Sequence, residues 1–132
     1  MHDWRISSDY AKELLNHVIN NDGSVIDIGS GISTLLFGYG LKGKGTGKVI
    51  AIEHSKNYYE ATKKLITEHQ LGKWCNVYFC PLRSYTINGE KWLWYDISDI
   101  DFPKNISTIS IDGPPGDTQD LARYPAPHIL KK

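Results

Sequence analysis

The spacing of hydrophobic residues changes several times along this chain, and each change predicts a new structural element. Over residues 8–20 the apolar side chains recur three and four positions apart, which is the spacing of one face of an amphipathic helix. Residues 24–28 instead form a short β-branched run that ends at Gly29, as expected for a buried strand that enters a turn. The chain therefore opens with a helix followed by a strand.

The alternation of helix and strand continues through the rest of the sequence. The further elements that we expect are a helix at 32–39, a strand at 48–53, a helix at 55–70, a strand at 75–80, a hairpin of 85–87 and 91–95, and a strand at 106–111. Asn88 and Gly89 separate the two hairpin strands and tolerate the positive φ of a tight turn. Such alternation predicts an α/β fold with right-handed crossovers and a mainly parallel sheet that carries helices on both faces.

Composition excludes several classes of protein. At 132 residues the chain is long enough for one domain, and its 15 basic and 15 acidic residues balance, so no global charge favours nucleic acid or anionic lipid. No apolar run approaches the ~20 residues of a membrane span, and the first residues contain no apolar signal core, so a cytoplasmic location is predicted. The spacing of Cys75 and Cys80 suits neither a redox pair nor a metal site and indicates reduced core thiols.

The turn after the first strand is the place where a ligand is expected, because parallel α/β sheets bind ligands outside the carboxyl ends of their strands. Gly29 and Gly31 have no side chains, so a ligand can lie against the main chain beside the amides of the next helix. Asp27 lies inside a strand suited to burial, where an unpaired carboxylate is costly. A ligand ammonium group or nearby donors would offset that cost.

A second acidic residue refines the class of ligand. Glu53 ends the second strand, where a carboxylate can accept hydrogen bonds from both hydroxyls of a ribose; the alternative is a solvated charge at a strand end. Thr34 stands where the dinucleotide pattern GxGxxG has its third glycine, which weakens a nicotinamide interpretation. The stretch 40–48 mixes glycine and lysine but lacks the P-loop pattern and indicates a solvated loop.

Two runs resemble known motifs. VIDIGSGIST, residues 25–34, resembles motif I of the class I S-adenosylmethionine-dependent methyltransferases, and VIAIEHS, residues 49–55, looks like their second motif. In that family the glycine loop holds the methionine part of the cofactor and the acid after the second strand holds its ribose. The cofactor-binding residues that the resemblance implies are Asp27, Gly29, Ser30, Gly31, Ser33 and Glu53, with His54 as a neighbour.

The resemblance also implies a fold and a cofactor. The fold is a Rossmann-like three-layer α/β/α arrangement in a single domain over residues 1–132, with the strand order 3-2-1-4 when only parallel strands are numbered. The cofactor is S-adenosylmethionine, and the acceptor is an unidentified oxygen or nitrogen nucleophile. The family has an acid after the third strand for the adenine amino group, and residues 80–83 offer none.

The turn after the strand at 106–111 supplies the candidate catalytic residue. Asp112 opens the run DGPPG, whose two prolines stiffen the loop, and it is placed to accept a proton from the substrate or to bind a divalent ion. The alternative is an incidental acid in a structural turn. DGPPG, the later run ARYPA and the residues WYD at 94–96 resemble one methyltransferase subgroup. No metal ligands are assigned.

The family pattern continues through three further strands that are missing here. We therefore expect either that the chain is a fragment or that the open edge of the strand at 106–111 is covered by a partner, which is another protein or a second copy of this chain. A non-catalytic, partner-dependent binding module is the main alternative to an enzyme. An NAD-dependent oxidoreductase is the weaker one, since it shares the fold and the ribose acid.

Overall fold

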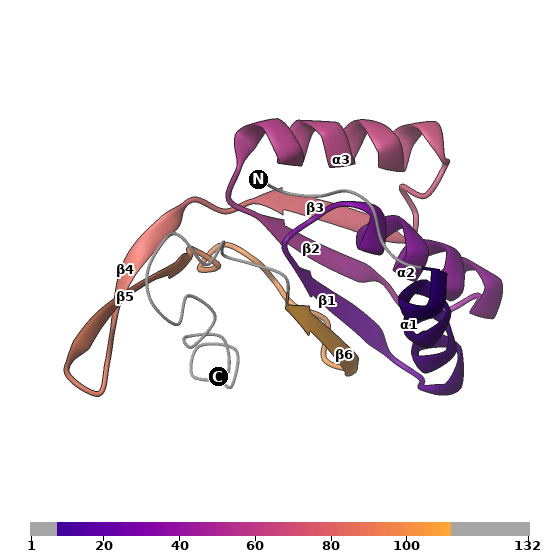
Figure 1. Cartoon of the computed structure of the whole chain (residues 1–132), viewed down its shortest axis with the longest axis horizontal. Coiled ribbons are helices and arrows are strands. Elements are labelled where there is room, and N and C mark those ends of the chain that lie inside the picture. The colour runs from indigo at the N-terminus through magenta and orange to yellow at the C-terminus, as the bar shows by residue number, and fades with distance from the viewer. Residues whose placement is uncertain (1–7, 112–132) are drawn as a thin grey trace.

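Helices and strands alternate along residues 8–111, the part of the chain that this computed structural model describes (Figure 1). In chain order the elements are α1 (Ser8–Asn20), β1 (Ser24–Ile28), α2 (Ile32–Lys44), β2 (Val49–Glu53), α3 (Lys56–Glu68), β3 (Cys75–Phe79), β4 (Leu82–Ile87), β5 (Glu90–Tyr95) and β6 (Ile106–Ile111). None of the helices in this range is long and apolar enough to cross a membrane. The predicted α/β class is confirmed.

Four parallel strands form the main sheet in the order β3-β2-β1-β6. Counted along the whole chain, the strand beside β1 is the sixth, so the order differs from the expected 3-2-1-4, in which only parallel strands are numbered and β6 is the fourth. The difference arises because β4 and β5 pair only with each other, as a separate two-stranded antiparallel sheet. In the main sheet Ile28 pairs with Ile52 on one side and with Ile111 on the other.

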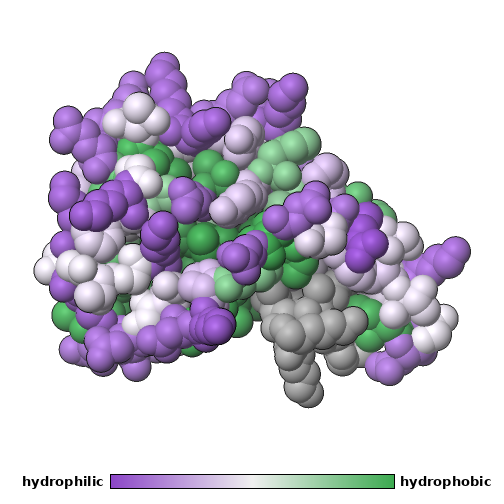
Figure 2. All heavy atoms as spheres, turned by 180° about the vertical axis from the view of Figure 1, so that it is seen from behind, coloured by the Kyte–Doolittle hydropathy of each residue, from purple (hydrophilic) through white to green (hydrophobic). Residues whose placement is uncertain are grey.

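The two faces of the main sheet pack against different partners. Val25, Val49 and Cys75 point to one face and pack with residues from all three helices. Ile26, Ile28 and Ile52 point to the other face, where their partners are Cys80, Trp94 and Tyr95 with side chains from the hairpin and the loop after it. Figure 2 shows hydrophobic side chains gathered in the middle of the molecule when it is seen from behind.

Helices on both faces of the sheet are not confirmed within the described residues, where the helices lie on one face. The connection from β3 to β6 contains the predicted hairpin and a loop, and it passes over the face opposite the helices. Trp94 and Tyr95 are almost fully buried, at 0% and 1% exposure, and they supply the apolar surface that a helix would otherwise bury. The sheet thus has one helical layer within residues 8–111.

Helix α2 is longer than its sequence indicates. It was expected to end near Tyr39, with a loose loop after it, and it continues to Lys44, where Gly45 adopts the left-handed conformation that ends many helices (φ 84°). Glycine inside the helix serves close packing: a Cβ on Gly38 would collide with Sγ of Cys75, and one on Gly40 would lie 3.2 Å from a methyl group of Val18. Tertiary contacts therefore override the low helix propensity of glycine.

The hairpin turn agrees with its prediction. Asn88 and Gly89 both have positive φ, 52° and 83°, as a type I′ turn requires. The strands are longer than expected and begin at Leu82 and Glu90. The hydroxyl of Tyr85 donates a 2.7 Å hydrogen bond to the carbonyl of Tyr95, and this bond joins the two strands near their base.

The two cysteines lie on opposite faces of the sheet. Cys75 belongs to the helical cluster and Cys80 to the cluster behind the sheet, and both are free thiols that are 3% exposed. This confirms the prediction of core thiols. Burial raises the pKa of each thiol to about 12, with a smaller contribution from Asp27 at Cys75 and from Asp96 and Asp99 at Cys80.

Two glycines of α2 should respond in opposite ways to the same substitution. Gly38→Ala forces α2 away from Cys75 and is expected to lower the free energy of unfolding by about 1–3 kcal/mol. Gly43→Ala meets no atom within 4 Å and should raise it by about 0.5–1 kcal/mol through helix propensity. Urea unfolding of both variants measures the two effects, and stabilisation by Gly38→Ala would contradict the packing described.

The cysteines should make stability fall in alkaline solution. The unfolded thiols lose their protons near pH 9.0, whereas the folded ones keep them until about pH 12, so their contribution to the free energy of unfolding decreases as the pH rises through that window. We expect neither thiol to react with an aromatic disulfide reagent at neutral pH until the protein is unfolded. A variant with alanine at both positions should lose less stability over the same rise in pH.

Candidate functional site

The carboxyl ends of β1 and β2 lie side by side and bring the two predicted acids to one edge of the sheet. Ile28 and Ile52 are register partners, and the amide of Gly29 extends the ladder with a 2.8 Å bond to the carbonyl of Ile52. The turn at Gly29 and Gly31 therefore stands directly beside Glu53. Both glycines have positive φ, 91° and 148°, which explains why glycine occupies these positions.

The first acid, Asp27, is fully buried at 0% exposure and is the residue before the last one of β1. Its Oδ2 atom accepts hydrogen bonds from the hydroxyls of Ser33 at 2.9 Å and Thr34 at 2.7 Å. Both donors come from the first turn of α2. These hydrogen bonds offset part of the free-energy cost of burying the Asp27 carboxylate, and they hold the start of the helix against the strand.

Thr34 has a second contact that the sequence did not indicate. Its Oγ1 atom accepts a 3.3 Å hydrogen bond from the amide of Gly31 while it donates to Asp27. The sequence had marked Thr34 only as the residue in place of a third glycine. Its hydroxyl in fact connects the glycine turn to the buried acid, and a side-chain hydroxyl in the first turn of a helix was the available signal.

The second acid, Glu53, is buried to 4% exposure, so the alternative of a solvated charge at the strand end is wrong. Its Oε1 atom accepts hydrogen bonds from the amide of Ser30 at 3.0 Å and the hydroxyl of Ser30 at 2.8 Å. Its Oε2 atom accepts one from the amide of Ser55 at 3.0 Å. Glu53 therefore ties the turn after β1 to the turn before α3.

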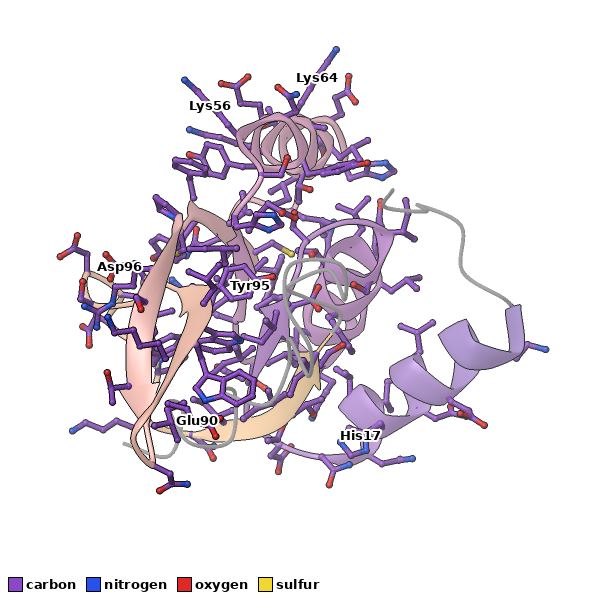
Figure 3. The ribbon with its side chains drawn as sticks, turned by 60° about the vertical axis from the view of Figure 1, so that its left-hand side comes forward. His17, Lys56, Lys64, Glu90, Tyr95 and Asp96 are labelled. Carbon is purple, nitrogen blue, oxygen red and sulfur yellow. The ribbon has the colours of Figure 1, made fainter. Side chains whose placement is uncertain are left out.

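Two further residues complete this network. Thr62, fully buried on α3, places Oγ1 2.9 Å from the hydroxyl of Ser30. His54 lies with Nδ1 3.5 Å from Oε2 of Glu53, and its ring meets Tyr95 edge to face at a centroid distance of 5.9 Å. In Figure 3 Tyr95 points inward from the hairpin, whereas Asp96 points outward. The sequence missed Thr62, because no local pattern marks a contact between α3 and the turn.

The amides of the turn are used within the chain. Those of Gly29, Ser30 and Gly31 donate to Ile52, Glu53 and Thr34 in turn. The next two amides, those of Ile32 and Ser33, belong to the first turn of α2, where the amides of a helix have no partner within the helix itself.

The predicted cofactor residues thus lie together, whereas the predicted catalytic residue falls outside the description. All the predicted cofactor residues lie at the carboxyl ends of β1 and β2, in the turns that follow or in the first turn of α2. They are Asp27, Gly29, Ser30, Gly31, Ser33, Glu53 and His54. Asp112 lies outside residues 8–111, so its role stays a prediction. Within that range no group of three His, Cys, Asp or Glu side chains is arranged to hold a metal ion.

The two hydroxyls that bond to Asp27 should differ in their effect on stability. Thr34→Val removes a donor that is fully buried and is expected to lower the free energy of unfolding by about 1.5–3 kcal/mol, the range for a hydrogen bond to a buried charge. Ser33→Ala removes a half-buried donor that water can replace and should cost less. Thermal unfolding measures both variants, and an equal or larger loss for Ser33→Ala would contradict this view of the site.

Comparison with known proteins adds no assignment. No protein family model matches the chain. No curated protein matches it either.

Proposed function

We propose that this chain binds S-adenosylmethionine and belongs to the Rossmann-like methyltransferases, which transfer a methyl group to an oxygen or nitrogen nucleophile. The observation that carries the proposal is the position of Glu53: a buried carboxylate at the end of β2, in direct contact with the glycine turn of β1. The proposal includes a three-layer organisation of the whole domain, of which residues 8–111 provide the sheet and one helical layer.

The chemistry of the site suits the parts of this cofactor. A carboxylate can accept hydrogen bonds from two vicinal hydroxyls, and the carboxylate of Glu53 lies beside the turn. Asp27 and Glu53 place two acidic side chains around a bend where a sulfonium and an ammonium group would carry positive charge. The amides of Ile32 and Ser33 at the start of α2 favour an anionic group, such as the carboxylate of an amino acid.

Methyl transfer makes modest demands on the protein. The reaction is an in-line displacement at a sulfonium methyl group, so the chain must align the nucleophile and exclude water, and it needs no covalent intermediate. In this proposal Asp27 and the start of α2 orient one end of the cofactor, Glu53 holds its sugar, and Asp112 accepts the substrate proton. The methyl acceptor stays unidentified.

A non-catalytic binding module is the second candidate, and one observation favours it. Glu53 and the amides of Gly29, Ser30 and Gly31 already have hydrogen-bond partners within the chain, so these groups need no ligand to complete their hydrogen bonds. The NAD-dependent oxidoreductase gains no comparable support, since Thr34 in place of the third glycine uses its hydroxyl on Asp27.

Binding of S-adenosylhomocysteine, the stable product form of the cofactor, tests the proposal. We expect the wild-type chain to bind it in preference to NAD in isothermal titration calorimetry. Glu53→Gln should weaken binding by about 1–3 kcal/mol, because the amide accepts fewer hydrogen bonds and carries no charge. Glu60→Gln, an exposed position on α3, is the matched control and should leave affinity unchanged.

Absence of binding by the wild-type chain would reject the cofactor. Equal affinity of the Glu53→Gln and Glu60→Gln variants would reject the role of Glu53 while the cofactor assignment stands.

A further inference from the structure

The acceptor positions of Glu53 are nearly all occupied by the chain itself. A carboxylate has about four positions that accept hydrogen bonds, two on each oxygen. Ser30 alone fills both positions on Oε1, with its amide at 3.0 Å and its hydroxyl at 2.8 Å, and Ser55 fills one on Oε2. His54 Nδ1 lies 3.5 Å from the same Oε2 atom. A ligand with two vicinal hydroxyls therefore has to displace one of these donors.

Of these donors the Ser30 hydroxyl is the one that can leave at low cost. The amides of Ser30 and Ser55 belong to the main chain of two turns, so their removal would move the backbone. The hydroxyl of Ser30 moves by rotation about a single bond. It also has a second partner, because Oγ1 of Thr62 lies 2.9 Å away.

The direction of the hydrogen bonds shows what Thr62 does in each state. Ser30 has one hydroxyl proton, which it donates to Glu53, so in this structure Thr62 donates to the oxygen of Ser30. When a ligand hydroxyl takes the position on Glu53, Ser30 can turn its proton toward Thr62, and Thr62 can turn its own proton to the carbonyl four residues earlier on α3, the bond that Thr67 makes to Lys63 on the same helix. Thr62 is 0% exposed, so no water competes for that role.

We propose that the hydroxyl of Ser30 is a built-in substitute for a ligand hydroxyl on Glu53, and that Thr62 receives it when the ligand binds. Ser30 and Thr62 then set the affinity of the site for molecules with a vicinal diol. This inference rests on the proposed function, in which Glu53 holds a ribose. It adds that the ligand-free site is closed by its own side chain and opens without movement of the sheet.

The proposal predicts opposite effects at the two hydroxyl positions. Ser30→Ala removes the competitor and should tighten binding of S-adenosylhomocysteine about three- to tenfold, the equivalent of one net hydrogen bond. Thr62→Val, nearly unchanged in volume, removes the second partner of Ser30 and should weaken binding about two- to fivefold. Thr67→Val, exposed on the same helix, is the matched control and should change nothing.

The double variant gives a readout that a purely structural role would not produce. With Ala at position 30 there is no hydroxyl for Thr62 to receive, so Thr62→Val should no longer affect the affinity. Calorimetric titration of the wild type, both single variants, the double variant and the Thr67→Val control completes the cycle. Thermal unfolding of each protein first establishes that it is folded at the temperature of the titration.

The results separate the proposed function from the inference about Ser30. If the wild type binds and Ser30→Ala binds equally or more weakly, Ser30 is no competitor and the inference is overturned while the proposed function stands. If no protein of the set binds S-adenosylhomocysteine, the proposed function fails and the inference fails with it. If Ser30→Ala does not fold, the contrast between Thr62→Val and Thr67→Val decides, and equal affinities overturn the inference.

Discussion

The contact between Glu53 and Ser30 is the interaction on which the organisation of this edge of the sheet depends. A buried carboxylate must find hydrogen-bond donors, and Glu53 finds them in the turn after β1 and the turn before α3. The bond between Gly29 and Ile52 brings these turns together. Register between β1 and β2 therefore fixes both the fold and the position of the acid.

The second acid depends on the same geometry. Asp27 is held by the hydroxyls of Ser33 and Thr34, so α2 can start only where those side chains reach β1. Thr34 also accepts from Gly31, and this bond limits the path of the turn. Two buried carboxylates and four hydroxyl-bearing side chains, those of Ser30, Ser33, Thr34 and Thr62, thus form one polar region at the carboxyl edge of an otherwise apolar sheet. Such a region is costly unless it serves a ligand or fixes a unique structure.

Local signals in the sequence predicted much of this structure. Helix α1 and strand β6 have the predicted bounds, and the turn at Asn88 and Gly89 has the expected conformation, because periodicity and turn chemistry act over a few residues. The end of α2 was placed too early, since Gly38 and Gly40 serve contacts with Cys75 and Val18 that lie far away in the sequence. The helical layer expected on the second face of the sheet is not among the described residues, where side chains of the predicted hairpin and of the loop after it cover that face.

The candidate site shows the same division between local and distant information. Glycines and acids at strand ends can be recognised from the sequence, whereas the contact of Thr62 with Ser30 spans 32 positions and has no local signature. The most direct measurement is an amide NMR titration of the labelled protein with S-adenosylhomocysteine. The account predicts saturable shifts at Ser30, Ser33 and Ser55 and none at Gly89 in the hairpin turn. Unchanged signals at all three serines with saturating ligand would contradict it.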